Sequence, residues 1–331
     1  MHAIILYYYA KVEAKMLGWI IAAAILTALL AAGALWEKHC RRRDAAAYPC
    51  PGKMVEVPGA RMHVLAQGEG PRIVLLTGWN TAVPSVDFQP LAKELNARGF
   101  RVVIPEKPGY GYSTDSNVPR QLDTVVDELR LALREAGEEG PYLLLGHSMA
   151  GTELVRWACR FPEEVRAIYS LDAPAPMCYT TVPLPPLFAR HIQRFQHYFG
   201  LKRISMAIPR FRKSYWKYLN QYAYLDPVLL PIEKAMVIKN GGSHATWNEM
   251  KLLRENAKVA GGDVPEGIPV MMFIASDTHD QRWDALQPTE DEFIARNHAR
   301  TLIVEGMHNL QHFQPALIAQ TIAADKERLG L

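Results

Sequence analysis

The chain has 331 residues, of which 49% are hydrophobic, 21% are charged and 9% are aromatic, and its formal net charge is +3. A chain of this length and composition can bury a full hydrophobic core, which excludes disordered and collagen-like proteins. Its four cysteines are too few for a disulfide framework and lack the spacing of a zinc site.

The first predicted element is an apolar helix over residues 16–36, which read MLGWIIAAAILTALLAAGALW and include no charged side chain. At about 1.5 Å per residue it reaches roughly 30 Å, the thickness of the hydrocarbon core of a bilayer. Basic residues flank both of its ends, which suits lipid headgroups better than a protein core. We therefore expect a single-pass transmembrane anchor, with residues 1–15 as an N-terminal tail and 37–54 as a linker.

Two questions about this segment stay open from the sequence. A cleaved signal peptide is the alternative to an anchor, because Ala32-Gly33-Ala34 has the small-x-small form of a cleavage site. Four basic residues follow the span and two precede it. This bias favours a cytoplasmic main domain, while an anchor with the domain outside is the other arrangement.

Short apolar runs after the linker predict strands. Two antiparallel strands are expected at 55–57 and 62–66, followed by strands at 73–78, 101–106, 142–147, 167–172, 270–276 and 301–306. Helical patterns lie between them, over 87–98, 120–136, 149–160, 287–298 and 313–328. Aliphatic strands that alternate with helices predict an α/β fold with a mainly parallel sheet covered on both faces.

The alternation breaks between Asp172 and Gly267, where the chain is mostly helical and aromatic. We expect a helical cap over residues 177–267, inserted above the carboxyl ends of the strands, where open α/β sheets hold their sites. The predicted core domain then consists of residues 55–176 and 268–331.

A motif that carries chemistry joins the strand at 142–147 to the next helix through Gly146-His147-Ser148-Met149-Ala150-Gly151. A serine on a tight strand-to-helix turn has an exposed hydroxyl, and the backbone N–H of the next residue is free. Such a turn needs small neighbours, and Ala150 stands where the usual pattern has its second glycine. His147 is expected to be structural. The alternative is an ordinary turn with an incidental serine.

With this turn, the chain resembles the α/β-hydrolase fold family over residues 55–331, in particular members with a helical cap. The sequence PGYGYS at 108–113 is similar to a structural turn of that family, and Thr77-Gly78-Trp79-Asn80 is similar to its His-Gly loop, with Thr77 in place of the histidine. The resemblance implies an oxyanion hole made by the backbone N–H groups of Trp79 and Met149. It implies no metal and no organic cofactor.

The resemblance also implies a histidine base and a carboxylate in the order Ser, Asp, His. His308 follows the last predicted strand in a G-x-H turn, and His312 is the weaker candidate. Asp277 comes directly after the strand at 270–276 and is our expected partner of His308. Asp280 and Asp172 are the alternatives, since some relatives keep their acid after the sixth strand, where Asp172 stands.

Part of the predicted cap is strongly basic. Residues 177–225 include eight Lys and Arg and no Asp or Glu. Three interpretations stay open: a solvated face beside aromatic side chains that pack on the sheet, a surface lying against anionic lipid, or a funnel for acidic substrates. Nucleic-acid binding is not expected, because no recognition motif accompanies the charge.

Taken together, the sequence predicts a membrane-anchored serine hydrolase. Ser148 would attack an ester, thioester or amide carbonyl and form an acyl-enzyme. The first expectation is carboxylesterase or lipase-like action on a small-molecule substrate with an apolar acyl chain. The alternatives are an aminopeptidase of the same fold and a non-catalytic binding protein that kept the fold. Dehalogenases and epoxide hydrolases need an aspartate nucleophile, so Ser148 argues against both.

Overall fold

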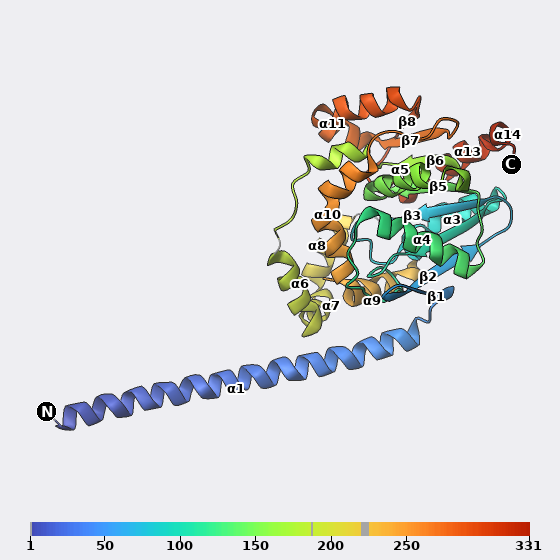
Figure 1. Ribbon diagram of the computed structural model, residues 1–331. Helices are drawn as coiled ribbons and strands as arrows, with labels where there is room; N and C mark the ends of the chain where they lie inside the picture. The colour runs from blue at the N-terminus through green and yellow to red at the C-terminus, as the bar shows by residue number, and fades with distance from the viewer. Residues whose placement is uncertain (1, 187, 220–224) are drawn as a thin grey trace.

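An eight-stranded sheet forms the centre of the protein. The structure, a computed structural model, describes residues 2–186, 188–219 and 225–331; within them the side chains of 2–6, 10, 215–219 and 278–285 are not described. The strand order is β1-β2-β4-β3-β5-β6-β7-β8, and helices cover both faces of the sheet (Figure 1).

The strands match the predicted runs closely. Strand β2 is antiparallel to β1 and β4, and all pairs from β4 through β8 are parallel, which confirms the predicted fold class. The strands are β1 (Lys53–Val57), β2 (Ala60–Gln67), β3 (Arg72–Leu76), β4 (Arg101–Glu106), β5 (Tyr142–His147), β6 (Val165–Leu171), β7 (Val270–Ala275) and β8 (Arg300–Val304).

Two apolar cores lie on the two faces of this sheet. Buried side chains of α3 and α13 pack on one face, and those of α4, α5 and α11 pack on the other. Every residue of β5 and β7 is buried, as expected for strands covered on both faces. The α-helices of the core domain are α2 (Pro84–Asp87), α3 (Gln89–Ala97), α4 (Leu122–Ala136), α5 (Gly151–Arg160), α11 (Ser276–Arg296), α12 (Leu310–Phe313), α13 (Pro315–Ala324) and α14 (Lys326–Leu329).

The connection between β6 and β7 is a helical segment at one end of the domain (Figure 1). Its last helix, α10, packs against α5 and against the short helix η3 that follows β6. The segment includes η3 (Pro176–Thr180), α6 (Phe188–Tyr198), α7 (Leu201–Ala207), α8 (Pro209–Leu219), η4 (Pro227–Leu229), α9 (Leu230–Asn240) and α10 (His244–Ala260).

The N-terminal helix α1 (His2–Ala47) is continuous and extends away from the domain (Figure 1). Its most apolar window has a mean hydropathy of 2.2 and no buried residue, so α1 is long and apolar enough to cross a membrane. The helix continues past the predicted end at residue 36, because its last turns are held by the domain. Glu37 is 1% exposed, and Arg203 binds both Glu37 (2.7 Å) and Asp44 (2.8 Å).

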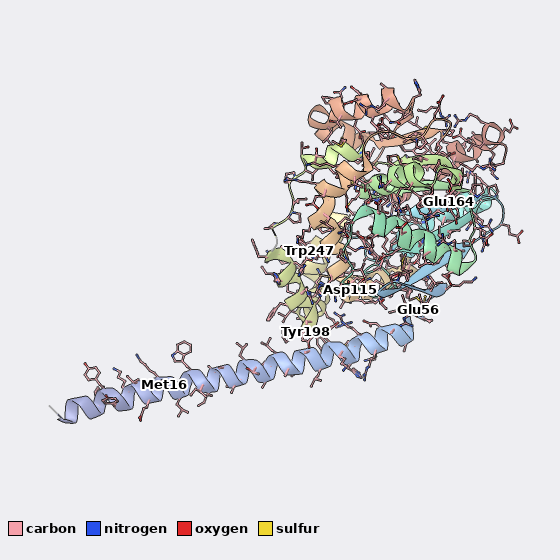
Figure 2. All side chains as sticks on the ribbon, in the orientation of Figure 1. Met16, Glu56, Asp115, Glu164, Tyr198 and Trp247 are labelled. Atoms are coloured by element: carbon pink, nitrogen blue, oxygen red, sulfur yellow. The ribbon has the colours of Figure 1, made fainter. Side chains whose placement is uncertain are left out.

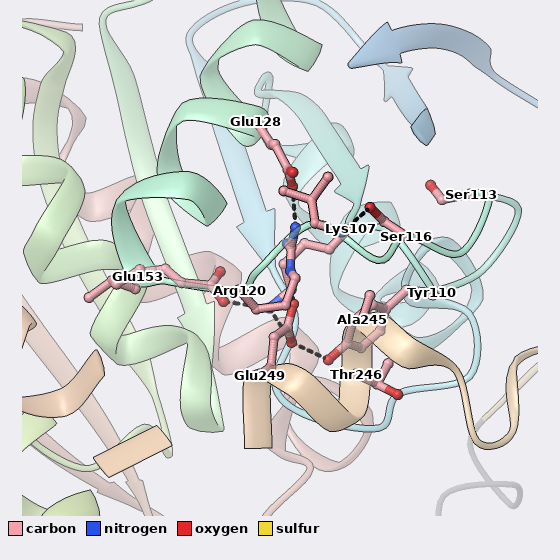
Figure 3. A network of polar contacts seen from close by, with 12 residues as sticks. Lys107, Tyr110, Ser113, Ser116, Arg120, Glu128, Glu153, Ala245, Thr246 and Glu249 are labelled. Atoms are coloured by element: carbon pink, nitrogen blue, oxygen red, sulfur yellow. Dashed lines mark hydrogen bonds and ion pairs between the residues drawn. The ribbon is translucent and has the colours of Figure 1, made fainter. Parts of the chain in front are cut away.

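A buried network of charged side chains ties α10 to the core (Figure 3). Arg120 lies 2.5 Å from Glu128 of α4 and 3.4 Å from Glu249 of α10. Lys107, just after β4, binds Glu153 of α5 and lies 3.5 Å from Glu249. Four elements are therefore joined by charges that are almost completely removed from water, where losing one partner costs far more than at the surface.

The network includes three carboxyl groups and two cations. Burial raises the pKa of Glu153 to about 7, although the nearby Lys107 charge opposes the shift. Burial also raises the pKa of Glu128. When Glu153 takes up a proton near neutral pH, two carboxylates and two cations remain, and the charges of the network balance.

This raised pKa gives a prediction for stability. A carboxyl that binds its proton more tightly when folded stabilises the protein below its unfolded pKa, and that stabilisation is lost as the pH rises to the folded value. We expect wild type to lose up to about 3 kcal/mol relative to Glu153→Gln between about pH 4.5 and 7. Thermal unfolding of the full chain in a neutral detergent measures this difference.

The control is Glu292→Gln, because Glu292 forms an exposed ion pair with Arg296 in the same helix. Its stability should follow the pH dependence of wild type. A stability difference between wild type and Glu153→Gln that is constant across this pH range would contradict the prediction.

Candidate active site

Ser148 stands on a tight turn between β5 and α5, as predicted. Its φ is +56°, a left-handed conformation that is strained for a residue with a side chain. The turn leaves no room for larger neighbours. A Cβ on Gly146 would lie 2.8 Å from the Leu154 side chain, and one on Gly151 would lie 3.1 Å from Ala173. Ala150, in place of the second glycine of the motif, is fully buried.

The loop after β3 comes directly against this serine. A Cβ on Gly78 would lie 2.7 Å from the Cβ of Ser148, so only glycine fits there without a shift. The neighbouring Trp79 is fixed through its indole Nε1, which donates to the carbonyl of Thr246 on α10 at 2.7 Å. Thr77, at the family's histidine position, hydrogen-bonds through its hydroxyl to that of Thr81 at 2.7 Å.

Met149 follows Ser148 in the short helix η1 (Ser148–Ala150) and its side chain is buried. The first N–H groups of a helix have no acceptor within it. Met149 and Trp79 are the predicted oxyanion donors. Met149 lies on the turn that carries Ser148, and Trp79 lies on the loop after β3 that packs against this serine.

His308 lies in the loop between β8 and α12, and its partner is Asp172. The Nδ1 of His308 is 2.5 Å from Oδ2 of Asp172. Asp172 is 4% exposed and follows β6 with a positive φ of 43°. Its other oxygen, Oδ1, accepts from the backbone N–H of Ala275 at 2.9 Å. A buried carboxylate with both oxygens occupied holds an imidazole in one orientation and stabilises its protonated form.

The prediction that Asp277 orients His308 is therefore wrong. Asp277 is exposed in the first turn of α11, and its backbone N–H donates to Gly306 O at 3.2 Å. The physical reason is that α11 begins at Ser276, immediately after β7, so that Asp277 enters a helix instead of the expected loop. Asp280 belongs to the same helix, and its side chain lies outside the described residues.

His147 is structural, and it supports His308. Its Nε2 donates to the backbone carbonyl of His308 at 3.0 Å, and the two ring centroids are 4.6 Å apart. Burial lowers the pKa of His147 to about 4, and the charge of His308 adds to the shift. A neutral His147 can thus hold the main chain at His308 without competing for its proton.

His312, the weaker candidate for the base, is engaged elsewhere. Its Nε2 lies 2.9 Å from Oδ1 of Asp87, and Gln311 donates to the other oxygen of the same carboxylate at 2.9 Å. All three side chains are buried. This group joins α12 to α2, and so fixes the chain that follows His308.

Tyr179 is a site residue that the sequence did not indicate. It lies in η3 after β6, and its buried side chain is close enough to Ser148 for the serine to affect the pKa of its hydroxyl. Burial raises the pKa of its hydroxyl, which therefore stays protonated. A lone tyrosine in an irregular segment carries no periodic or motif signal, and only the folded contact reveals it.

Among the described residues, no group of three or more His, Cys, Asp and Glu side chains could hold a metal ion.

Comparisons with known proteins identify the fold family of the chain. A family model described as the alpha/beta hydrolase fold matches residues 71–315. The uncharacterized protein YbdG of Bacillus subtilis is 28% identical over 281 residues, covering 82% of this chain and 85% of its own. A pimeloyl-[acyl-carrier protein] methyl ester esterase of Xanthomonas axonopodis is 27% identical over 262 residues, covering 79% of this chain and 90% of its own.

Solved structures show the same architecture. Epoxide hydrolase from Solanum tuberosum superposes with a TM-score of 0.62 at 18% sequence identity, covering 83% of this chain and 98% of its own. A similarity of this kind supports the fold alone. With the family match over most of its length, the chain belongs to the α/β-hydrolase fold family.

Proposed function

We propose that this protein is a serine hydrolase that cleaves acyl esters. Ser148 is the nucleophile, His308 is the base, and Asp172, not Asp277, is the carboxylate that orients His308. The observation that carries the proposal is the hydrogen bond between the buried Asp172 and the exposed His308, at the same edge of the sheet as the strained turn of Ser148. The esterase named among the relatives supports the ester as the bond that is cleaved.

In the proposed reaction, Ser148 Oγ attacks the carbonyl carbon while Nε2 of His308 takes the hydroxyl proton. The backbone N–H groups of Trp79 and Met149 stabilise the oxyanion, and each such donor contributes about 3 kcal/mol to the transition state. His308 then gives its proton to the leaving alcohol, and the acyl group stays on Ser148. Water, activated by the same histidine, releases the acid.

Covalent labelling with a fluorophosphonate probe tests this proposal. We expect the full chain to be labelled and Ser148→Ala to be unlabelled, because the probe reacts with an activated serine. A wild type that resists the probe, or equal labelling of the variant, would mean that the protein is not a serine hydrolase. Turnover of p-nitrophenyl esters of increasing chain length beside amino-acid anilides separates an esterase from an aminopeptidase.

The assignment of the carboxylate gives a second prediction. Asp172→Asn should lower kcat for a p-nitrophenyl ester by about 10³–10⁴-fold, because His308 loses the partner that fixes its tautomer. Asp277→Asn is the matched control and should stay within about twofold of wild type, since surface changes away from a site have small effects. The opposite result for the two variants would restore Asp277 as the acid.

We also propose that α1 anchors the protein in a membrane. Its apolar surface is exposed over several turns, as at Trp19, Leu29 and Leu35, and a continuous apolar surface of this size needs a cover. Lipid would cover the exposed side chains of residues 16–36, while Glu37 and Asp44 hold the next turns against the domain.

Alkaline carbonate extraction of cell membranes tests the anchor. The full chain should stay in the membrane pellet, and mass spectrometry should recover peptides from before residue 16. A mature chain that begins after Ala34 and is released into the supernatant would establish a cleaved signal peptide instead.

A further inference from the structure

A groove of about 920 Å³ lies between α1 and the domain. Residues of α1 from Ala34 to Ala45 form one wall. The loop after β4, the end of α6 and the turn between α9 and α10 form the other. Tyr198 and Asp115 both line it, and Tyr198 lies on the side of the domain next to α1 in Figure 2.

The lining of this groove is strongly basic, with six Lys and Arg side chains against Glu37 and Asp115. Both acids already have partners. Glu37 binds Arg203 and Arg41, and Asp115 accepts from the first backbone N–H groups of α10. The six basic side chains therefore outnumber the acidic ones, and the groove has an excess of positive charge.

Three of the six cations are exposed and form no ion pair with any residue that the structure describes: Lys38, Arg42 and Arg61. Two of the others have structural roles. Arg41 donates to three backbone carbonyls of the β6–β7 segment, and Lys239 donates to the carbonyls of Gly111 and Ser113. Lys38 and Arg42 are one helical turn apart, so they share one side of α1.

The groove lies at the point where the apolar part of α1 ends. Lys38 comes two residues after Trp36, and the ring of Trp36 packs on Gly200, where a Cβ would lie 2.9 Å from it. A Cβ on Gly33 would likewise lie 2.7 Å from the carbonyl oxygen of Phe199. The turn between α6 and α7 thus reaches the last apolar turn of α1, and next to it Tyr198 is 67% exposed.

We propose that this groove binds the headgroup of an anionic phospholipid. The inference rests on the proposed insertion of α1, which brings the groove to the depth of the lipid phosphates. Lys38, Arg42 and Arg61 would bind the phosphodiester, for which guanidinium groups offer paired donors. The acyl chains would follow the exposed apolar surface of α1 and Tyr198. Basic pockets beside membrane helices recognise anionic headgroups on the same physical basis.

The test uses the full chain in a neutral detergent, titrated with dioctanoyl phosphatidylglycerol and, separately, with dioctanoyl phosphatidylcholine. Native mass spectrometry measures the bound lipid. We expect the anionic lipid to bind more tightly, and the triple variant K38A/R42A/R61A to bind it on the order of 100-fold more weakly. The control K93A/R166A/K258A removes the same charge from exposed residues outside the groove and should bind like wild type.

Three results would overturn the proposal: equal binding of both lipids, wild-type binding by K38A/R42A/R61A, or equal weakening in the control variant. A further titration adds inorganic phosphate to the lipid-bound protein at the same ionic strength and measures the lipid that stays bound. If phosphate displaces the lipid at equal concentration, the groove is a site for free anions. Carbonate extraction of K38A/R42A/R61A should still leave it in the membrane pellet, which separates loss of this site from failure of the anchor.

Discussion

The arrangement of the site depends on one steric constraint, the crowding of three chain segments at Ser148. The serine has a positive φ, the loop after β3 passes so close that Gly78 can carry no side chain, and α5 begins with Gly151 against the end of β6. These contacts require β3, β5 and β6 to be neighbours in the sheet, which is their observed order. The same edge then receives Asp172 from β6 and the loop of His308 from β8.

Most of this plan could be predicted from the sequence, because the buried strands are nearly continuous apolar runs and the serine turn has a short, local motif. The choice of Asp172 over Asp277 as the partner of His308 could not be predicted. The helical pattern in the sequence begins only at residue 287, whereas α11 begins at Ser276 and includes Pro288, although a proline normally ends or kinks a helix. Asp172 is aimed at His308 by a left-handed backbone conformation that no periodicity reveals.

The charged network behind the site was equally hidden from the sequence. Hydrophobic periodicity identifies buried faces by their apolar residues, and a buried glutamate breaks the pattern in the same way as a solvated one. Glu153 and Glu249 lie on helices whose other buried positions are largely small or apolar. Only the folded arrangement shows that they meet Lys107 and Arg120, and so connect the helix that follows Ser148 to the helix that holds Trp79.

The helix α1 reaches the domain without a break, and its last turns are fixed by Arg203 and by Arg41. A tether of flexible residues would let the domain rotate freely above a bilayer, whereas a continuous helix gives it one orientation. For an inserted chain, the β6–β7 segment would always face the lipid. Molecules that diffuse laterally in the bilayer would then meet this segment first, and those in bulk water would have to approach around it.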